Sequence, residues 1–288
     1  GAIIQMTVDE QRRELQRRLK KSRFAHSIGV ANTAVKLAEK FGVDKNKAYV
    51  AGLLHDCARE FENEDLPAQA IKRGIKIGEV ERSAPLLLHA YIGAKMVQEI
   101  YGVDDAEIIQ AIYRHTVGAK NMTALDKIIY FADMIEPNRD YPGVEKLREL
   151  AATSNNLDEI ILTALSESII FVVSKGALVH PATVDARNYL ILMREGKNMM
   201  YPFMTLNDDT EITHSELLPD DSVKVYIETP DEKDGFHHMT VYLPSYRVDE
   251  VHKYTQAEVE KYFEFIRSTA HIILSLAKQG GFENATYI

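Results

Sequence analysis

The sequence predicts a mainly α-helical protein with a small α+β module at its carboxyl end, and three observations support this. Over residues 1–195, apolar side chains recur every three or four positions, the period of an amphipathic helix. After Gly196, two short segments alternate between apolar and polar residues around a turn. Residues 1–194 carry 26 acidic and 26 basic side chains, whereas residues 195–288 carry 17 and 8. We therefore expect two domains, at residues 1–195 and 196–288.

The expected helices of the first domain are delimited by residues that favour helix ends. Thr7 is a suitable cap for the first helix, Gly42 ends the second, and Pro181 opens the last. The stretch 60–84 contains a proline and two glycines, so we expect it to be irregular. The expected helices span about residues 7–21, 22–41, 45–59, 85–101, 104–116, 123–135, 144–152, 156–175 and 181–195.

The second domain is expected to be a ββα-like module that is acidic overall. Residues 223–229 and 238–243 alternate like strands, and the turn residues between them, 230–235, predict a β-hairpin. Residues 256–278 predict one long helix with an apolar stripe. Three tyrosines of this module are expected to pack against that helix: Tyr226, Tyr242 and Tyr246.

Composition excludes several classes of protein. A hydrophobic content of 45% supports a sizeable core, and the net charge of −9 lies in the last third, which argues against binding of nucleic acid or an anionic membrane there. No apolar run approaches the roughly 20 residues that span a bilayer, and no signal peptide is recognisable. The one cysteine, Cys57, excludes an internal disulfide. We expect a cytoplasmic protein without nucleic-acid or membrane partners.

Six residues in the first domain carry most of the functional information. Asp56 follows the apolar run 51–54, and Asp133 follows the run 128–132. A buried carboxylate without a partner would cost several kcal/mol or become neutral, and a metal ion removes that conflict. Neutral imidazole and carboxylate together suit iron, manganese or zinc. The candidate ligands are His26, His55, Asp56, His89, His115 and Asp133.

Each candidate also has a simpler interpretation. His26 shares a helix face with apolar residues, and a single histidine in such a place is more often a hydrogen-bonded core residue than a ligand. The adjacent histidines His237 and His238 lie on an expected strand, where neighbours point to opposite faces, so a solvated hairpin explains them better than a second metal site.

The ligand types indicate the chemistry. A metal ion with an open position lowers the pKa of bound water toward about 7 and neutralises charge on phosphate oxygens. A second metal ion, or protonated His89 and His115, would hold the remaining oxygens. The nearest cations in sequence are Arg59, Arg114 and Arg139, for which a solvated helix face or a surface pair remains open and is favoured for Arg114. The pattern predicts a metal-dependent hydrolase of phosphate esters or anhydrides.

Longer motifs around these residues resemble a known family. They are FAHSIGVA at 24–31, AGLLHDCARE at 51–60, LHA at 88–90, YRHTVG at 113–118 and IYFADMIEPNR at 129–139. Over about residues 10–193 the chain resembles the HD superfamily of metal-dependent phosphohydrolases, and within it the YqeK family. The resemblance implies an HD-domain helical bundle for residues 1–195 and does not extend to residues 197–288, whose role stays unknown.

The resemblance also implies an activity and roles for the candidate residues. It implies symmetrical hydrolysis of diadenosine tetraphosphate to two ADP, with one or two divalent ions, iron above all and Mn, Co, Zn or Mg as alternatives. His26, His55, Asp56 and Asp133 would bind the main ion, and His89 and His115 would complete a second or bind phosphate. Asp56, His89 and His115 would take part in catalysis. The residues implied to contact substrate phosphates are Arg59, His115 and Arg139.

Two other functions stay open at this point. One is a different HD-type nucleotide phosphohydrolase or a cyclic-dinucleotide phosphodiesterase, although the Gly-Tyr-Pro signature of the latter is absent from the chain. The other is a regulatory protein that senses a nucleotide and signals through residues 196–288. The acidic module itself is interpreted most simply as a dimerisation element, giving a homodimer, or as a binding element for an unknown protein.

Overall fold

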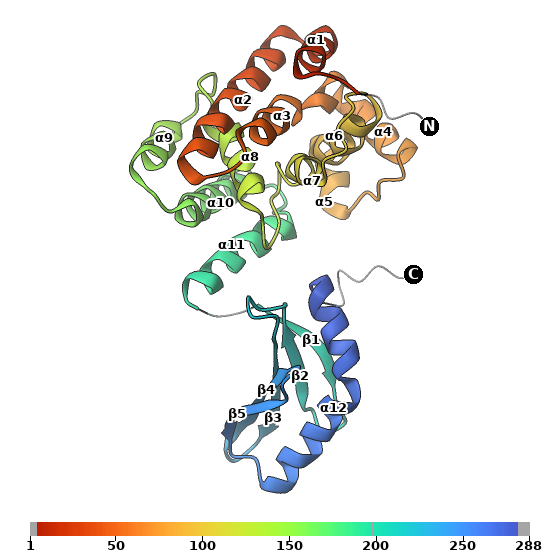
Figure 1. The fold of residues 1–288 in the computed structure, drawn as a ribbon, viewed down its shortest axis with the longest axis vertical. Coiled ribbons are helices and arrows are strands. Elements are labelled where there is room, and N and C mark those ends of the chain that lie inside the picture. The colour runs from red at the N-terminus through yellow and green to blue at the C-terminus, as the bar shows by residue number, and fades with distance from the viewer. Residues whose placement is uncertain (1–4, 197–198, 282–288) are drawn as a thin grey trace. The chain divides into compact units, whose positions relative to one another are not determined.

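The structure, a computed structural model, describes residues 5–196 and 199–281 (Figure 1). Contacts within the chain divide it into two compact units, Gly1–Ile191 and Leu192–Ile288. The division falls a few residues before the expected boundary at 195. In the described part of the chain, the first unit is helical throughout and the second combines a sheet with one long helix, so the predicted mainly α class with an α+β module is confirmed.

The first unit is a bundle of α-helices with three short 3₁₀ segments, η1 to η3, between them. The helices are α1 Val8–Arg18, α2 Lys21–Phe41, α3 Lys45–Leu54, α4 Leu66–Lys72, α5 Glu79–Ser83, α6 Leu88–Glu99, α7 Ala106–Tyr113, α8 Ala124–Ile135, α9 Val144–Thr153, α10 Leu157–Ser174 and α11 Pro181–Arg194. The 3₁₀ segments are η1 Cys57–Glu60, η2 Asn63–Asp65 and η3 Pro85–Leu87. The stretch 60–84, expected to be irregular, therefore contains two short helices.

The expected helix 45–59 is too long, and its actual end has a local cause. Helix α3 stops at Leu54. The Nδ1–H of His55 donates to the carbonyl of Gly52 at 2.6 Å, an oxygen that in a continuing helix would accept the backbone N–H of Asp56. The His55 side chain thus occupies the Gly52 carbonyl, and the chain continues as the 3₁₀ segment η1.

The core of the first unit lies where α2 packs against α3 and α8. A Cβ at Gly52 would lie 2.8 Å from the Cα of Ala31, a distance that carbon atoms do not tolerate, so only glycine lets α2 and α3 approach this closely. Helix α8 begins with a capping box, in which Thr123 and Asp126 bond each other's backbone N–H. Its apolar residues, Phe131 among them, are buried. This packing fixes the helix ends that carry the candidate ligands.

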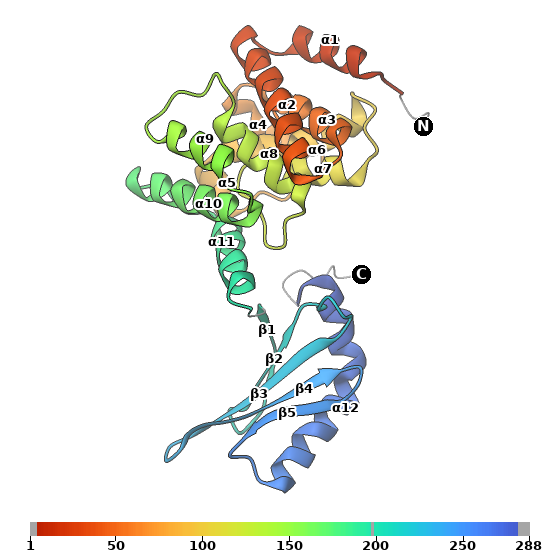
Figure 2. The same cartoon turned by 60° about the vertical axis from the view of Figure 1, so that its left-hand side comes forward.

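The second unit is a five-stranded antiparallel sheet with α12, Gln256–Gln279, across one face (Figure 2). The strands run in sequence order and are β1 Met200–Thr205, β2 Glu211–Ser215, β3 Val223–Asp231, β4 Gly235–Leu243 and β5 Arg247–His252. Val225 and Ile227 on β3, Val241 on β4 and Ile266 on α12 are fully buried in a core separate from that of the bundle. The alternating pattern of β3 and β4 places every second residue on this face.

The predicted hairpin and long helix are confirmed as β3, β4 and α12, but the ββα description is incomplete because β1, β2 and β5 were not predicted. The expected packing of Tyr226 against the helix is wrong. Tyr226 alternates with the buried Val225 and Ile227, so it lies on the other face, where its hydroxyl donates to Glu228. Tyr246 does contact Phe263 of α12, with ring centroids 5.9 Å apart.

Tyr242 also faces away from α12, because it alternates with the buried Val241 and Leu243, and the guanidinium of Arg247 covers its ring at 4.5 Å. Among the described residues, no helix combines the length and the apolar character needed to cross a membrane.

Candidate metal centre

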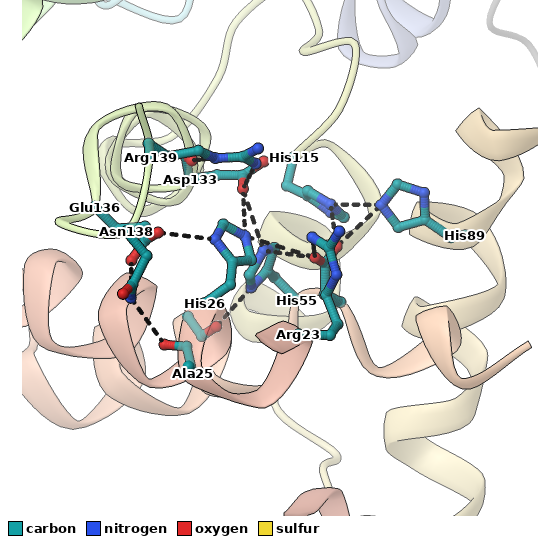
Figure 3. A network of polar contacts seen from close by, with 12 residues as sticks. Arg23, Ala25, His26, His55, His89, His115, Asp133, Glu136, Asn138 and Arg139 are labelled. Atoms are coloured by element: carbon teal, nitrogen blue, oxygen red, sulfur yellow. Dashed lines mark hydrogen bonds and ion pairs between the residues drawn. The ribbon is translucent and has the colours of Figure 1, made fainter. Parts of the chain in front are cut away.

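Five elements of the first unit bring the six predicted ligands together (Figure 3). Helix α2 contributes His26, the end of α3 contributes His55 and Asp56, and α6 contributes His89 near its start. The remaining two are His115, just after α7, and Asp133, on α8. Asp133 is the most accessible of the six, with 18% of its side chain exposed, whereas the other five are buried.

Asp56 is the middle of the cluster, and its two oxygens face two different pairs of histidines. Oδ2 lies 3.6 Å from the Nε2 of His26 and 3.5 Å from the Nε2 of His55. Oδ1 lies 3.1 Å from the Nε2 of His89 and 3.5 Å from the Nε2 of His115. One carboxylate therefore joins two neighbouring sets of nitrogen atoms.

Asp133 completes the first of these sets. Its Oδ1 lies 2.9 Å from the Nε2 of His26 and 3.4 Å from the Nε2 of His55. Three overlapping groups of three residues place one ligand atom each within 4.8 Å of the others, which is close enough to share a metal ion. The groups are His26, His55 and Asp56; His55, His115 and Asp133; and Asp56, His89 and His115.

All four histidines present the same nitrogen to the centre. In three of them, the Nδ1–H donates to the backbone carbonyl three residues earlier in the chain; the pairs are His55 with Gly52, His89 with Leu86 and His115 with Ile112. In the fourth, the Nδ1–H of His26 donates to Glu136 Oε1 at 3.2 Å. Because the proton is held on Nδ1, each Nε2 directs a lone pair into the cluster, as metal-binding imidazoles do.

No donor group of the described protein forms a hydrogen bond to these Nε2 lone pairs. Among the described residues, the Nε2 atoms of His26 and His55 are buried without a hydrogen-bond partner. The Nε2 atoms of His89 and His115 face each other at 3.1 Å, although neither carries the proton that a bond between them would need. A cation satisfies all four nitrogens and both carboxylates, so the donor set fits a divalent metal ion.

The charges of the cluster suit a cation as well. Burial opposes ionisation of Asp56 and Asp133, but the surrounding histidines outweigh it and hold the pKa of each carboxyl well below its usual range. Burial also disfavours protonated His55, yet the two carboxylates raise its pKa to about 9. Burial lowers the pKa of His115, which keeps this imidazole neutral and able to coordinate.

The three predicted arginines differ in their surroundings. Arg139 donates from Nη2 to Asp133 Oδ1 and from Nε to the Asp133 carbonyl, both at 2.8 Å. Arg59 is half-buried near both carboxylates, but its guanidinium forms no hydrogen bond or ion pair with the described residues, and burial together with Arg23 lowers its pKa. Arg114 pairs with the buried Asp126 at 2.9 Å, away from the cluster.

Two contributors to this site were not predicted from the sequence. The Nη1 of Arg23 lies 3.0 Å from Asp56 Oδ2, and Glu136 holds His26 as described above. The available signal was helical spacing, because Arg23 precedes His26 by three residues and Glu136 follows Asp133 by three, which places each pair on one helix face.

The second unit contains one further group of oxygen and nitrogen ligands, Asp231, Asp234 and His237, in the turn of the β3–β4 hairpin. Asp234 is exposed, and Asp231 and His237 are only partly buried. His237 lies against Tyr254, whereas His238 stacks on His252 with ring centroids 4.8 Å apart, so the adjacent histidines have separate surroundings, as expected for a strand. This group does not resemble the buried cluster of the first unit.

Known proteins are similar to this chain in sequence and in fold. The HD domain family matches residues 23–138, a range that contains all six predicted ligands. The chain is 39% identical to "Bis(5'-nucleosyl)-tetraphosphatase, symmetrical" of Bacillus subtilis (strain 168), covering 62% of this chain and 94% of that relative. It is 32% identical to the protein of the same name from Staphylococcus aureus (strain NCTC 8325 / PS 47), covering 64% and 94%.

A solved structure gives the same result. A Clostridium acetobutylicum protein, described as a predicted HD superfamily hydrolase involved in NAD metabolism, is 37% identical, with a TM-score of 0.62. The match covers 66% of this chain and all of that protein. By its six-residue cluster, its helical bundle and these relatives, the chain belongs to the HD superfamily, in the YqeK family of symmetrical bis(5'-nucleosyl)-tetraphosphatases.

Proposed function

We propose that this protein is a metal-dependent hydrolase that cleaves diadenosine tetraphosphate symmetrically to two molecules of ADP. The observation that carries the proposal is the arrangement of two histidine pairs around the two oxygens of Asp56. The names of the relatives, which are 32–39% identical over nearly their whole length, support the substrate.

The geometry favours two ions that share Asp56. His26, His55 and Asp133 would hold one ion together with Asp56 Oδ2, whose distances to both imidazoles are similar. His89 and His115 would hold the second together with Asp56 Oδ1. Mixed nitrogen and oxygen donors suit iron, which we propose as the native metal, with Mn, Co, Zn or Mg as alternatives.

Bound at this position, such ions would lower the pKa of a coordinated water toward about 7 and neutralise charge on the phosphate oxygens. The chain provides a separate anchor for the polyphosphate. Arg59 is a half-buried guanidinium that has no partner among the described residues, so a non-bridging phosphate oxygen would satisfy it. The leaving ADP is a weak base and needs little protonation, so the reaction does not require a dedicated general acid.

Arg139 has a second role in this proposal besides the expected contact with substrate phosphate. Its two hydrogen bonds to Asp133 orient that carboxylate, which would otherwise be free to rotate at the more accessible side of the cluster. With 38% of its side chain exposed, Arg139 can also meet a substrate phosphate. Arg139 would therefore both position a ligand and contact the substrate.

Product analysis tests the proposal. Protein of measured metal content is incubated with diadenosine tetraphosphate, and separately with ATP, a cyclic dinucleotide and a deoxynucleoside triphosphate. We expect ADP as the sole product from the first substrate, and no activity from an Asp56→Asn variant prepared in the same way, which excludes a contaminating hydrolase. AMP plus ATP would show that the central phosphorus is not attacked. No turnover by metal-loaded protein would favour a nucleotide sensor.

The remaining expectations belong to the protein as a whole. A cytoplasmic location, a homodimer and an unknown protein partner for residues 196–288 stay predictions. Size measurement of the full-length chain in solution distinguishes a homodimer from a monomer.

A further inference from the structure

We propose that Glu136 is a positioning residue of the metal centre, whose carboxylate fixes His26 with its Nε2 lone pair toward the ions. The inference rests on the proposed metal ligation by His26 and is independent of the substrate. Glu136 itself belongs to none of the groups of ligand atoms that could share an ion.

The imidazole of His26 lies between two carboxylates of the same helix end. Its Nε2 is 2.9 Å from Asp133 Oδ1, and its Nδ1 is 3.2 Å from Glu136 Oε1 (Figure 3). Asp133 and Glu136 are three residues apart, at the end of α8 and just after it, so both nitrogens of the His26 ring face carboxylates of this segment. Because the Nδ1–H is bound to Glu136, the ring cannot turn its Nε2 lone pair away from the cluster.

Neighbouring residues hold the Glu136 carboxylate in place. The side-chain amide of Asn138 donates to Glu136 Oε2 at 2.9 Å and lies 3.4 Å from the carbonyl of Ala25 on α2. A Cβ at Gly29 would lie 2.0 Å from Glu136 Oε2, so α2 admits the carboxylate only because residue 29 lacks a side chain. These contacts leave room for one carboxylate beside His26 and hold it there.

The backbone of Glu136 is also held. Its N–H donates to the carbonyl of Ala132 at 3.0 Å, and its own carbonyl accepts from Arg139 N at 2.9 Å and from Arg148 Nη2 at 2.8 Å. These bonds fix the backbone from which the Glu136 side chain extends toward His26.

The charge of Glu136 requires compensation. Its side chain is 1% exposed, and its carboxylate is bound by the side-chain amide of Asn138 and by His26. Within the described residues it forms no ion pair with lysine or arginine. A buried carboxylate bound only by an amide and an imidazole is costly, whereas positive charge beyond the same imidazole ring balances it. The metal ions on the Nε2 side of His26 would supply that charge.

His26 differs in this respect from the other three histidines, whose Nδ1–H groups donate to neutral backbone carbonyls. A carboxylate acceptor makes an imidazole a more basic ligand than a carbonyl does, and the loss of such a partner typically weakens metal binding by about 10- to 100-fold. We therefore expect Glu136 to strengthen metal binding specifically through His26.

The test compares three variants of the full-length protein with the wild type. Glu136→Gln keeps an acceptor for the His26 Nδ1–H but removes the charge, and Glu136→Leu removes both. Glu81→Gln is the matched control, because Glu81 is also a buried carboxylate bound to a histidine, His180 Nε2 at 2.7 Å, and it belongs to no ligand group. Metal is removed, and the affinity for Co²⁺ or Mn²⁺ is measured by competition with a chelator.

We expect the affinity to fall about tenfold in Glu136→Gln and up to about 100-fold in Glu136→Leu, with Glu81→Gln unchanged. The visible absorption of the Co²⁺-loaded protein should shift in both Glu136 variants. In both Glu136 variants kcat should fall while KM stays unchanged, because the Glu136 carboxylate does not reach the substrate. Gly29→Ala should act in the same direction, because its Cβ displaces the carboxylate.

Several outcomes would overturn the inference. Affinities and spectra like those of the wild type in both Glu136 variants would show that His26 needs no carboxylate partner. An equal loss in Glu81→Gln would show a general effect of removing buried charge. A wild-type protein that binds no metal would instead overturn the proposed centre itself, so failure of the centre and failure of the Glu136 role are distinguishable.

Discussion

Each unit of this protein contains a buried polar cluster, and the two clusters differ in their hydrogen-bond balance. In the second unit, four hydroxyls form a chain: Thr210 with Thr229 at 2.6 Å, Thr229 with Tyr254 at 2.6 Å, and Tyr262 with Thr210 at 3.1 Å. The Tyr262 hydroxyl donates to Asp208 at 2.9 Å, which ends the chain. A hydroxyl can both donate and accept, so this network satisfies its own members.

The cluster of the first unit cannot do the same. Its Nδ1 protons are used by acceptors outside the cluster, and once a metal ion displaces the second proton of His55, four imidazole lone pairs and two carboxylates remain inside. Arg23 and Arg139 each reach one oxygen of a carboxylate. Among the described residues, however, the Nε2 atoms of His26 and His55 have no hydrogen-bond partner, and a metal ion would provide one. The comparison teaches that the excess of acceptors over donors, more than burial or polarity, separates a binding centre from a structural network.

The largest expected effect is the loss of the shared carboxylate in Asp56→Ala. Metal content should fall to background and turnover by at least about a thousandfold, since several kcal/mol of transition-state stabilisation depend on the ions. Metal analysis and product chromatography measure both. The control is Asp126→Asn, a buried carboxylate whose partners Thr123, Gln110 and Arg114 balance it. The control should lose about 1–3 kcal/mol of stability yet keep its metal. Retained turnover in Asp56→Ala would refute the assignment of Asp56 as a metal ligand.

The second prediction is that, in the metal-free protein, the cluster of the first unit responds to pH and the hydroxyl network of the second unit does not. His55 has a pKa of about 9, above its usual 6.5, so protonation stabilises the metal-free fold fully below about pH 6.5, and this is lost as the pH rises through 9. Metal ions must displace that proton, so their affinity should rise about tenfold per pH unit from 7 toward 9.

The hydroxyl network should not respond over that pH range, because burial raises the pKa of Tyr254 to about 12. Chelator competition at several pH values, with calorimetry to count released protons, measures the effect. An affinity that does not change with pH would mean that no proton is bound at His55.

Removing one hydroxyl from the second cluster should have a smaller and purely structural effect. Tyr262→Phe removes the bonds of this hydroxyl to Asp208 and Thr210, although Thr210 keeps Thr229 as a partner, so it should cost about 1 kcal/mol in the stability of the second unit. Hydrogen exchange of the β2 and β3 amides measures the loss. Turnover and metal content should equal those of the wild type, and a change in either would contradict the separation of the two clusters.

The smallest effect is expected outside both clusters, at His238→Ala. His238 stacks on His252 on the face of the sheet that α12 does not cover, and such a cross-strand contact contributes at most about 1 kcal/mol. Kinetics should match those of the wild type. A more than tenfold loss of turnover would instead show that the second unit takes part in the reaction.

The helices were predictable because their apolar period is sustained over several turns, but their ends were less so. Ala58 continues the period of α3 into η1, so the pattern cannot reveal that the helix stops at Leu54. The missed strands lack an apolar alternation. Strand β1 contains Pro202 and a bulge, and β5 is rich in charge and largely exposed, both common at sheet edges, where one side of the strand has no partner.

All six candidate ligands were predictable because imidazoles and carboxylates interrupt apolar runs, and the structure brings them together. Arg23 and Glu136 were not, since a charged residue near a helix end usually faces solvent. Helical spacing places Glu136 on the same face as Asp133, but its contact with His26 joins positions 110 residues apart, which the spacing does not reveal. Only the fold places α8 beside α2.

The way α3 ends has a consequence for protein engineering. The hydrogen bond that stops this helix, from His55 to the Gly52 carbonyl, also orients the imidazole toward the ions. The bond from His115 to the Ile112 carbonyl has the same form just after α7. In each case the histidine and the carbonyl that accepts its Nδ1–H lie within four consecutive residues. Such a segment could be grafted onto a helix of a designed bundle, where the local carbonyl would keep the proton on Nδ1 and leave Nε2 free for a metal ion.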